Sequence, residues 1–334
     1  MELKLITPAG IEEHPVDEAA DLLSRPDVLV WLDIPVWDEQ AERLLRDVFG
    51  FHPLAIRDCS MRNQVPKVHV YPDHVFLVLH APQAGAAGHV HSIELDQFIG
   101  DRYLVTVHGP LSSGADPTAA RVEVDSLLKR LESGKLHPQR AYELSYALTS
   151  AVAGRLRKFI VRLTGDMWNL EYRFQDVVNE GPAGHLRDPE GFLDELFRTR
   201  HGFMVARTQA AMSREVFARM RKIKAFGPGG GQKRIDDAVD QFGHLRAMAD
   251  GERENLQGSI EFYQARTNTQ VALAAERLAV IAAITLPVTA VSSILGMNVI
   301  VNDATQPLEL AIALLLMVVM SAILLVWAKR RGWW

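Results

Sequence analysis

The short motif Gly296-Met297-Asn298 is the part of this 334-residue chain whose residue types and position best suit ligand chemistry. It ends a long apolar segment, and a glycine there favours the end of a helix. The Asn298 amide would then lie on non-helical backbone, where its carbonyl oxygen could accept hydrogen bonds from the waters around a cation. A plain helix end would contain the same residues, so the surroundings of the motif decide its interpretation.

Three carboxylates, Asp236, Asp237 and Asp240, lie close together near the start of a predicted helix, and Asp237 and Asp240 share a face. Carboxylates are suitable ligands for magnesium or calcium. Acidic residues near a helix start also cap it and complement its dipole. A metal site and helix capping are therefore both open interpretations.

A group of histidines falls in a region of predicted strands. His89 and His91 are two residues apart, and so they share one face of a strand. Together with His69, His74 or His80 they could form a zinc site. Surface histidines on a β-hairpin are the favoured interpretation.

Two other patterns lack the features that catalysis needs. The glycine-rich residues 227–233 (GPGGGQK) lack the Gly-Lys-[Ser/Thr] ending of a phosphate-binding loop, and a predicted helix precedes them. His52 and Cys59 form no recognisable nucleophile pair. We therefore expect a protein that is not an enzyme and that holds no cofactor.

The charges of the chain are unevenly placed. The net charge of −5 argues against a general nucleic-acid partner, and a single cysteine excludes an intrachain disulfide framework. Of 77 charged side chains, 72 lie within residues 1–277. The chain therefore divides into a large polar body and a short apolar C-terminal part.

Two uncharged stretches make up that apolar part: 25 residues at 278–302 and 19 residues at 310–328. A bilayer core about 30 Å thick takes about 20 apolar helical residues, so both stretches suit membrane spans rather than buried core helices. Lys329, Arg330 and Arg331 follow the second stretch, whereas residues 299–309 contain no Lys or Arg. Because basic residues favour the cytoplasmic side, we expect a multi-pass protein of the inner cell membrane with both termini in the cytoplasm.

The polar body is predicted to begin with a sheet and to continue as helices. A helix over residues 38–49 and a mixed sheet form an α/β unit, with strands at 28–32, 68–71, 75–79, 91–95 and 103–107. Further helices are predicted at 116–133, 139–178, 188–226 and 232–277. The last of these would be about 70 Å long, which suits a stalk that continues into the membrane. Its apolar stripe would pack against further copies of the chain, or within an intrachain bundle.

The predicted fold class is an α+β/α membrane protein, with an N-terminal α/β (αβα) cytoplasmic domain, a long stalk helix and two C-terminal transmembrane helices. The predicted boundaries are a cytoplasmic α/β domain at 1–115, a cytoplasmic helical region at 116–231, the stalk helix at 232–277, a first transmembrane helix at 278–298, an external loop at 299–309, a second transmembrane helix at 310–328 and a cytoplasmic basic tail at 329–334.

In this setting the sequence resembles the CorA family of metal ion transporters, which are divalent-cation channels. That family carries a Gly-Met-Asn tripeptide at the end of the first of two C-terminal spans, where Gly296-Met297-Asn298 stands here, and residues 286–289 (LPVT) are similar to its preceding segment. In the polar body, similar segments occur in the same order at 51–58, 66–68, 71 and 105–108. Two features depart from the family: Leu295 replaces an aromatic residue, and the loop at 299–309 lacks a Met-Pro-Glu-Leu run.

The resemblance implies a homopentamer in the lipid bilayer, in which five copies of the first span line a pore and Gly296, Met297 and Asn298 form the selectivity filter. Helical spacing from Asn298 then gives the predicted pore-lining and gate residues: Ser293, Thr289, Leu286, Ala282 and Leu278. Asp303 and Glu309 would attract cations to the outer mouth. Asp237 and Asp240 become candidates for an intracellular regulatory metal site.

The implied function is uptake of magnesium, with cobalt as a second ion, down the electrochemical gradient. Two charges crossing 100 mV release about 4.6 kcal/mol, so no nucleotide is needed. The expected partners are divalent metal ions, most of all Mg²⁺ as transported and regulatory cation, together with the bilayer and further copies of the chain. The alternatives are a zinc transporter of the ZntB type, a branch with a variant tripeptide, and a membrane-anchored cation sensor that does not transport.

Overall fold

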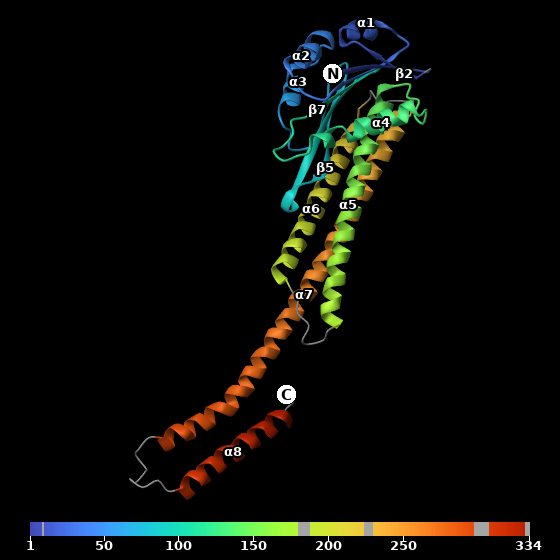
Figure 1. Ribbon diagram of the computed structural model, residues 1–334. Coiled ribbons are helices and arrows are strands. Elements are labelled where there is room, and N and C mark those ends of the chain that lie inside the picture. The colour runs from blue at the N-terminus through green and yellow to red at the C-terminus, as the bar shows by residue number, and fades with distance from the viewer. Residues whose placement is uncertain (9, 180–187, 224–229, 297–306, 331–334) are drawn as a thin grey trace. The chain divides into compact units, whose positions relative to one another are not determined.

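The computed structural model describes residues 1–8, 10–179, 188–223, 230–296 and 307–330 (Figure 1). The chain divides into two compact units, Met1–Gly258 and Ser259–Trp334. The first unit contains the sheet and the polar helices, and the second contains the apolar helical segments. The boundary between the units falls within the predicted stalk, ahead of the uncharged stretch that begins at residue 278.

A seven-stranded sheet forms the core of the first unit, in the order β2-β1-β3-β7-β6-β5-β4. The pair β3–β7 is parallel and every other neighbouring pair is antiparallel, so the predicted mixed sheet is confirmed. The strands are β1 (Glu2–Thr7), β2 (Gly10–His14), β3 (Leu29–Ile34), β4 (Lys67–Val70), β5 (Val75–Ala84), β6 (Val90–Ile99) and β7 (Tyr103–His108).

The hairpin of β1 and β2 was not predicted. In β1 the apolar residues Leu3 and Leu5 alternate with charged ones, and both leucines are buried. This alternation is the period of a strand. The run is short, however, and its charged residues lower its apolar content below that of a typical buried strand. Lys4 lies on the opposite face and is also buried, and the Glu2 carboxylate, 2.5 Å from its ammonium group, compensates its charge.

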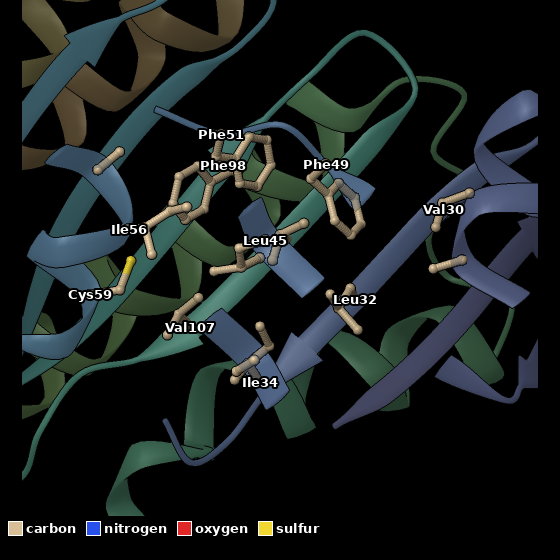
Figure 2. Close-up of a cluster of buried hydrophobic side chains, with 14 of the residues drawn as sticks. Val30, Leu32, Ile34, Leu45, Phe49, Phe51, Ile56, Cys59, Phe98 and Val107 are labelled. Carbon is tan, nitrogen blue, oxygen red and sulfur yellow. The ribbon is translucent and has the colours of Figure 1, made fainter. Parts of the chain in front are cut away.

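Short helices cover one face of the sheet: α1 (Ala19–Ser24), α2 (Glu39–Arg43), the π-helical turn η2 (Leu44–Val48) and α3 (Pro53–Ser60). Figure 2 shows the core beneath them, in which Leu45, Phe51 and Cys59 meet side chains of the central strands. The rings of Phe51 and Phe98 stack with their centroids 4.1 Å apart. Burial of such side chains stabilises each by about 1.5–3 kcal/mol, so this layer anchors the chain segments around residues 51–60.

Longer helices follow the sheet in the sequence. They are α4 (Val122–Glu132), α5 (Ala141–Asn179), α6 (Pro189–Met220) and α7 (Gly231–Gly296). The chain also contains the one-turn helices η1 (Val16–Glu18), η3 (Ala86–Gly88) and η4 (Pro117–Ala120). The α5 helix packs on β5 and β7 and against α6, so the first unit has helices on both faces of its sheet. The predicted helix at 116–133 is divided into η4 and α4, because Asp116 caps a separate turn that begins with Pro117.

The second unit contains the apolar end of α7 and the helix α8 (Pro307–Arg330). The α7 helix continues through Pro287 to Gly296. Among the described residues, one helix is long and apolar enough to cross a membrane: Gly231–Ile294, with an 18-residue window of mean hydropathy 1.9 that is entirely unburied. A core helix of a soluble protein would be buried, so this exposed apolar surface fits a helix that faces lipid or other copies of the chain.

Candidate functional site

The predicted filter lies at the end of α7. Gly296 is the last residue of that helix that the structure describes, so the predicted helix stop at the glycine stays a prediction. Met297 and Asn298 lie outside the described residues, as does Asp303. Glu309 belongs to the first turn of α8. The filter and the external acidic residues therefore stay predictions.

The predicted pore-lining residues all lie on α7. At 100° per residue, positions 278, 282, 286, 289 and 293 fall within an arc of about 80° on the helix surface. Leu278, Leu286, Thr289 and Ser293 are exposed, and Ala282 is half-buried. One continuous face of α7 thus combines small, hydroxylated and bulky apolar side chains, with polar groups toward the Gly296 end.

Thr285 was missed in the sequence and belongs beside this face. Its hydroxyl donates a hydrogen bond to the Ile281 carbonyl at 2.9 Å, and the Thr289 hydroxyl donates to the Thr285 carbonyl at 2.8 Å. Because each hydroxyl proton is used within the helix, the oxygen lone pairs remain free to accept hydrogen bonds. Both threonines can therefore receive hydrogen bonds from the water shell of a cation.

The predicted regulatory carboxylates lie on the part of α7 that belongs to the first unit. Asp237 accepts hydrogen bonds from the Tyr146 phenol of α5 and from the Gln241 amide. Asp236 pairs with Arg221 at 2.6 Å, whereas Asp240 is exposed. Partial burial and the adjacent Asp237 carboxylate raise the pKa of Tyr146, so its phenol stays a neutral donor. Both of these hydrogen bonds to Asp237 come from side chains. Helix capping would instead require bonds from backbone N–H groups at the start of the helix.

The histidines do not form a metal site in the part of the chain that the structure describes, where no group of three or more His, Cys, Asp or Glu side chains could hold an ion. His69 and His89 are exposed, but His74, His80 and His91 are buried, so the surface interpretation is wrong for these three. His80 bonds the Asn63 carbonyl at 3.0 Å and His91 bonds the Ser112 hydroxyl at 2.8 Å. Burial lowers the pKa of both rings, which favours their neutral forms.

A polar cluster between α3, β4 and β6 was also missed in the sequence. Glu94 accepts hydrogen bonds from the backbone N–H of Asn63 at 2.8 Å and from its side-chain amide. The Lys67 ammonium donates to Asn63 Oδ1 at 2.5 Å and to Asp58 Oδ2 at 2.7 Å. Asp58 and Lys67 belong to segments that carry the family resemblance, and this is the signal that could have drawn attention to them.

Comparison with known proteins agrees with this arrangement of helices. The family model described as CorA-like Mg²⁺ transporter protein matches residues 26–330. The YfjQ protein of Bacillus subtilis (strain 168) is 23% identical over 323 residues, covering 93% of this chain and 92% of that protein. The cobalt/magnesium transport protein CorA of Thermotoga maritima is 22% identical over 295 residues, covering 86% of this chain and 78% of that protein.

Solved structures share the fold. The complete structure of the CorA magnesium transporter from Methanocaldococcus jannaschii superposes with a TM-score of 0.79 at 16% identity, covering 100% of this chain and 99% of that one. The cytoplasmic domain of ZntB from Vibrio parahaemolyticus gives a TM-score of 0.53 at 10% identity, covering 79% of this chain and 98% of that one. The predicted fold class is thus confirmed. Because the family model spans nearly the whole sequence, the chain belongs to the family of CorA-like Mg²⁺ transporter proteins, whose members are divalent-cation transporters and not enzymes.

Proposed function

We propose that the chain forms a homopentameric channel for Mg²⁺ uptake, with Co²⁺ as a second transported ion. The observation that carries this proposal is the single face of α7 that bears positions 278, 282, 286, 289 and 293 and ends at Gly296. One chain supplies one such face, so several copies are needed to enclose a pore. The relatives named for magnesium and cobalt transport support this choice of ions.

The proposed mechanism keeps the ion hydrated. Magnesium dehydrates reluctantly, so a ring of Asn298 carbonyl oxygens would select it through its waters. Thr289 would then receive the hydrated ion further along the pore, and rings of Leu286 and Leu278 would form an apolar constriction that closes by dewetting. With no charged side chain on this face, the ion is held weakly enough to leave again.

The proposed regulation uses the α7 carboxylates Asp237 and Asp240. A divalent cation bound between the stalks of neighbouring copies would neutralise these groups and favour the closed pore. When the cytosolic cation concentration falls, repulsion between carboxylates would favour the open state. Such a switch requires that the cation bind the closed state more tightly than the open one.

The proposed topology is that of a multi-pass protein of the inner membrane, with α7 and α8 each crossing the bilayer and both termini in the cytoplasm. The 24 residues of α8 are long enough for a span, and Lys329 and Arg330 lie in its last turn. Asp303 and Glu309 would then lie on the outer side and attract cations to the pore mouth.

Zinc transport is the second candidate function. The likeness of the first unit to the ZntB cytoplasmic domain and the departure at Leu295 favour it, whereas Met297 favours magnesium. A membrane-anchored sensor that does not transport ions is the remaining alternative. All three differ in the ion flux that they produce.

Reconstitution into liposomes that enclose a fluorescent Mg²⁺ reporter tests the proposal, with a Zn²⁺ reporter in parallel. We expect Mg²⁺ entry with the natural chain and a loss of at least tenfold with Asn298→Ala, which corresponds to about 1.4 kcal/mol on the barrier. Asn302→Ala, in the predicted external loop, is the matched control and should retain the flux. Entry of Zn²⁺ alone would favour the ZntB type, and absence of flux for both ions would favour the sensor.

A further inference from the structure

A cavity of about 310 Å³ lies at one end of the sheet in the first unit, and none of its lining residues is predicted for conduction or regulation. Its partly exposed apolar wall comes from separate parts of the chain: Leu23 of α1, Val28 before β3, Val48 of η2 and Tyr103 of β7, with the edge of Phe49 beside them. Small-molecule sites in proteins begin at about 300 Å³, so this volume suits a compact ligand.

The charged groups that line the cavity are unequally neutralised. The Asp101 carboxylate accepts a hydrogen bond from Arg140 at 2.7 Å, and the Asp73 carboxylate lies 2.9 Å from His74 Nδ1. Within the described residues, neither the Arg25 nor the Arg102 guanidinium has a carboxylate partner. Asp101 thus has a cationic partner, whereas burial lowers the pKa of His74, so that Asp73 keeps its negative charge. The two arginines still outnumber that one carboxylate at the cavity, and this favours an anionic ligand.

The geometry restricts the ligand further. Arg102 donates a hydrogen bond to the Arg25 backbone carbonyl at 2.6 Å, which fixes a half-buried guanidinium at the cavity and lowers the entropy lost on binding. Beside it, the rings of Phe49 and Tyr103 meet edge to face with centroids 5.5 Å apart. A flat ring system can pack on such a wall while an attached anion meets the arginines.

We propose that this cavity binds a small phosphorylated ligand with a flat ring, of the nucleoside monophosphate class. The phosphate bonds Arg25 and Arg102, and the ring packs against Phe49 and Tyr103. This binding activity is additional to ion transport and does not depend on which cation the protein carries. The guanidinium forks match phosphate oxygens, and the apolar wall excludes water from the ring.

The test measures binding of adenosine monophosphate (AMP) to the full chain in detergent by titration calorimetry, with adenosine and inorganic phosphate as separate ligands. We expect AMP to bind at least about tenfold more tightly than either part, because the arginines and the apolar wall contribute separately. Arg102→Gln should weaken AMP binding by about tenfold or more. Val48→Phe should abolish it, because Val48 lines the cavity and is 37% exposed, so a larger side chain fills the space without disturbing the core.

Arg43→Gln is the matched control, since it removes an exposed arginine of α2 that does not line the cavity. Unchanged AMP binding in this variant supports the proposal. Absence of AMP binding to the natural chain overturns the proposal, and so does binding that neither Arg102→Gln nor Val48→Phe reduces. Equal affinity for AMP and adenosine overturns the role of the arginines, and equal affinity for AMP and phosphate overturns the role of the apolar wall.

Discussion

At the scale of single residues, Glu94 and Asp96 are two buried carboxylates on the same face of β6. Glu94 has Asn63 as a donor, whereas neither carboxylate oxygen of Asp96 has a hydrogen-bond partner among the described residues. Burial raises the pKa of both groups, that of Asp96 well above its ordinary value, and the neighbouring carboxylate raises it further. Asp96 is therefore best accommodated as the neutral acid.

This environment predicts a pH dependence of stability. Because the pKa of Asp96 is higher in the folded chain than in the unfolded chain, the folded state binds the proton more tightly. Stability is thus greatest below the ordinary value of 3.8 and falls as the pH rises toward the raised value. We therefore expect chemical unfolding of the natural chain to need progressively less denaturant as the pH rises above about 4.

Asp96→Asn imitates the protonated acid and should flatten this dependence, so that the variant unfolds later than the natural chain at about pH 8. Asp27→Asn changes an exposed carboxylate and serves as the control. If both variants keep the slope of the natural chain, Asp96 is not the group responsible.

At the scale of elements, the predicted pore face of α7 places Leu286 between Ala282 and Thr289. An apolar constriction excludes water only while its side chains are bulky. Leu286→Ala should therefore raise the Mg²⁺ leak through the closed channel several-fold in liposomes at high cytoplasmic Mg²⁺. Ile284→Ala shortens a similar side chain on the opposite face and should leave the leak unchanged. An unchanged leak with Leu286→Ala would place the gate elsewhere.

The contact between α5 and α7 bears on regulation, because the Tyr146 phenol bonds the carboxylate of Asp237. With both Asp237 and Asp240 changed to alanine, the proposed regulatory site is gone, and flux should no longer fall when cytoplasmic Mg²⁺ rises into the millimolar range typical of weak carboxylate sites. Magnesium should also cease to protect the stalk from protease.

Glu252→Ala with Glu254→Ala removes two carboxylates from the same helix and is the matched control. Inhibition by Mg²⁺ and protection that persist in the Asp237 and Asp240 variant would assign these residues a structural role and move the sensor elsewhere in the first unit.

At the scale of the whole molecule, the proposed channel would cover the exposed apolar surface of α7 and α8 with lipid and partner helices. Large exposed side chains include Leu278, Leu286 and Val318, each at least 65% exposed in the single chain. Since one chain supplies one pore-lining helix, we expect native mass spectrometry in mild detergent to show a pentamer. A stable monomer or dimer in every mild detergent would contradict the proposed channel.

Local pattern predicted most of the elements. The strands at residues 75–79 and 91–95 were predicted too short, because β5 and β6 pair over ten residues each, through the polar pair Gln83–His91. Cross-strand pairing, which a single run of residues does not reveal, extends these strands beyond their apolar parts. The five predicted pore-lining residues share one helix face, since helical spacing alone determines it.

The sequence by itself determined the class of the protein, because the lengths of its uncharged stretches, the placement of charge and the tripeptide Gly296-Met297-Asn298 are properties of neighbouring residues. Tertiary structure alone decided which side chains meet. Tyr146 reaches Asp237 across 91 positions, and Asn63 reaches Glu94 across 31. It also decided that His80 and His91 are buried. Such contacts follow from the packing of helices and strands against one another, and no periodicity within a segment encodes them.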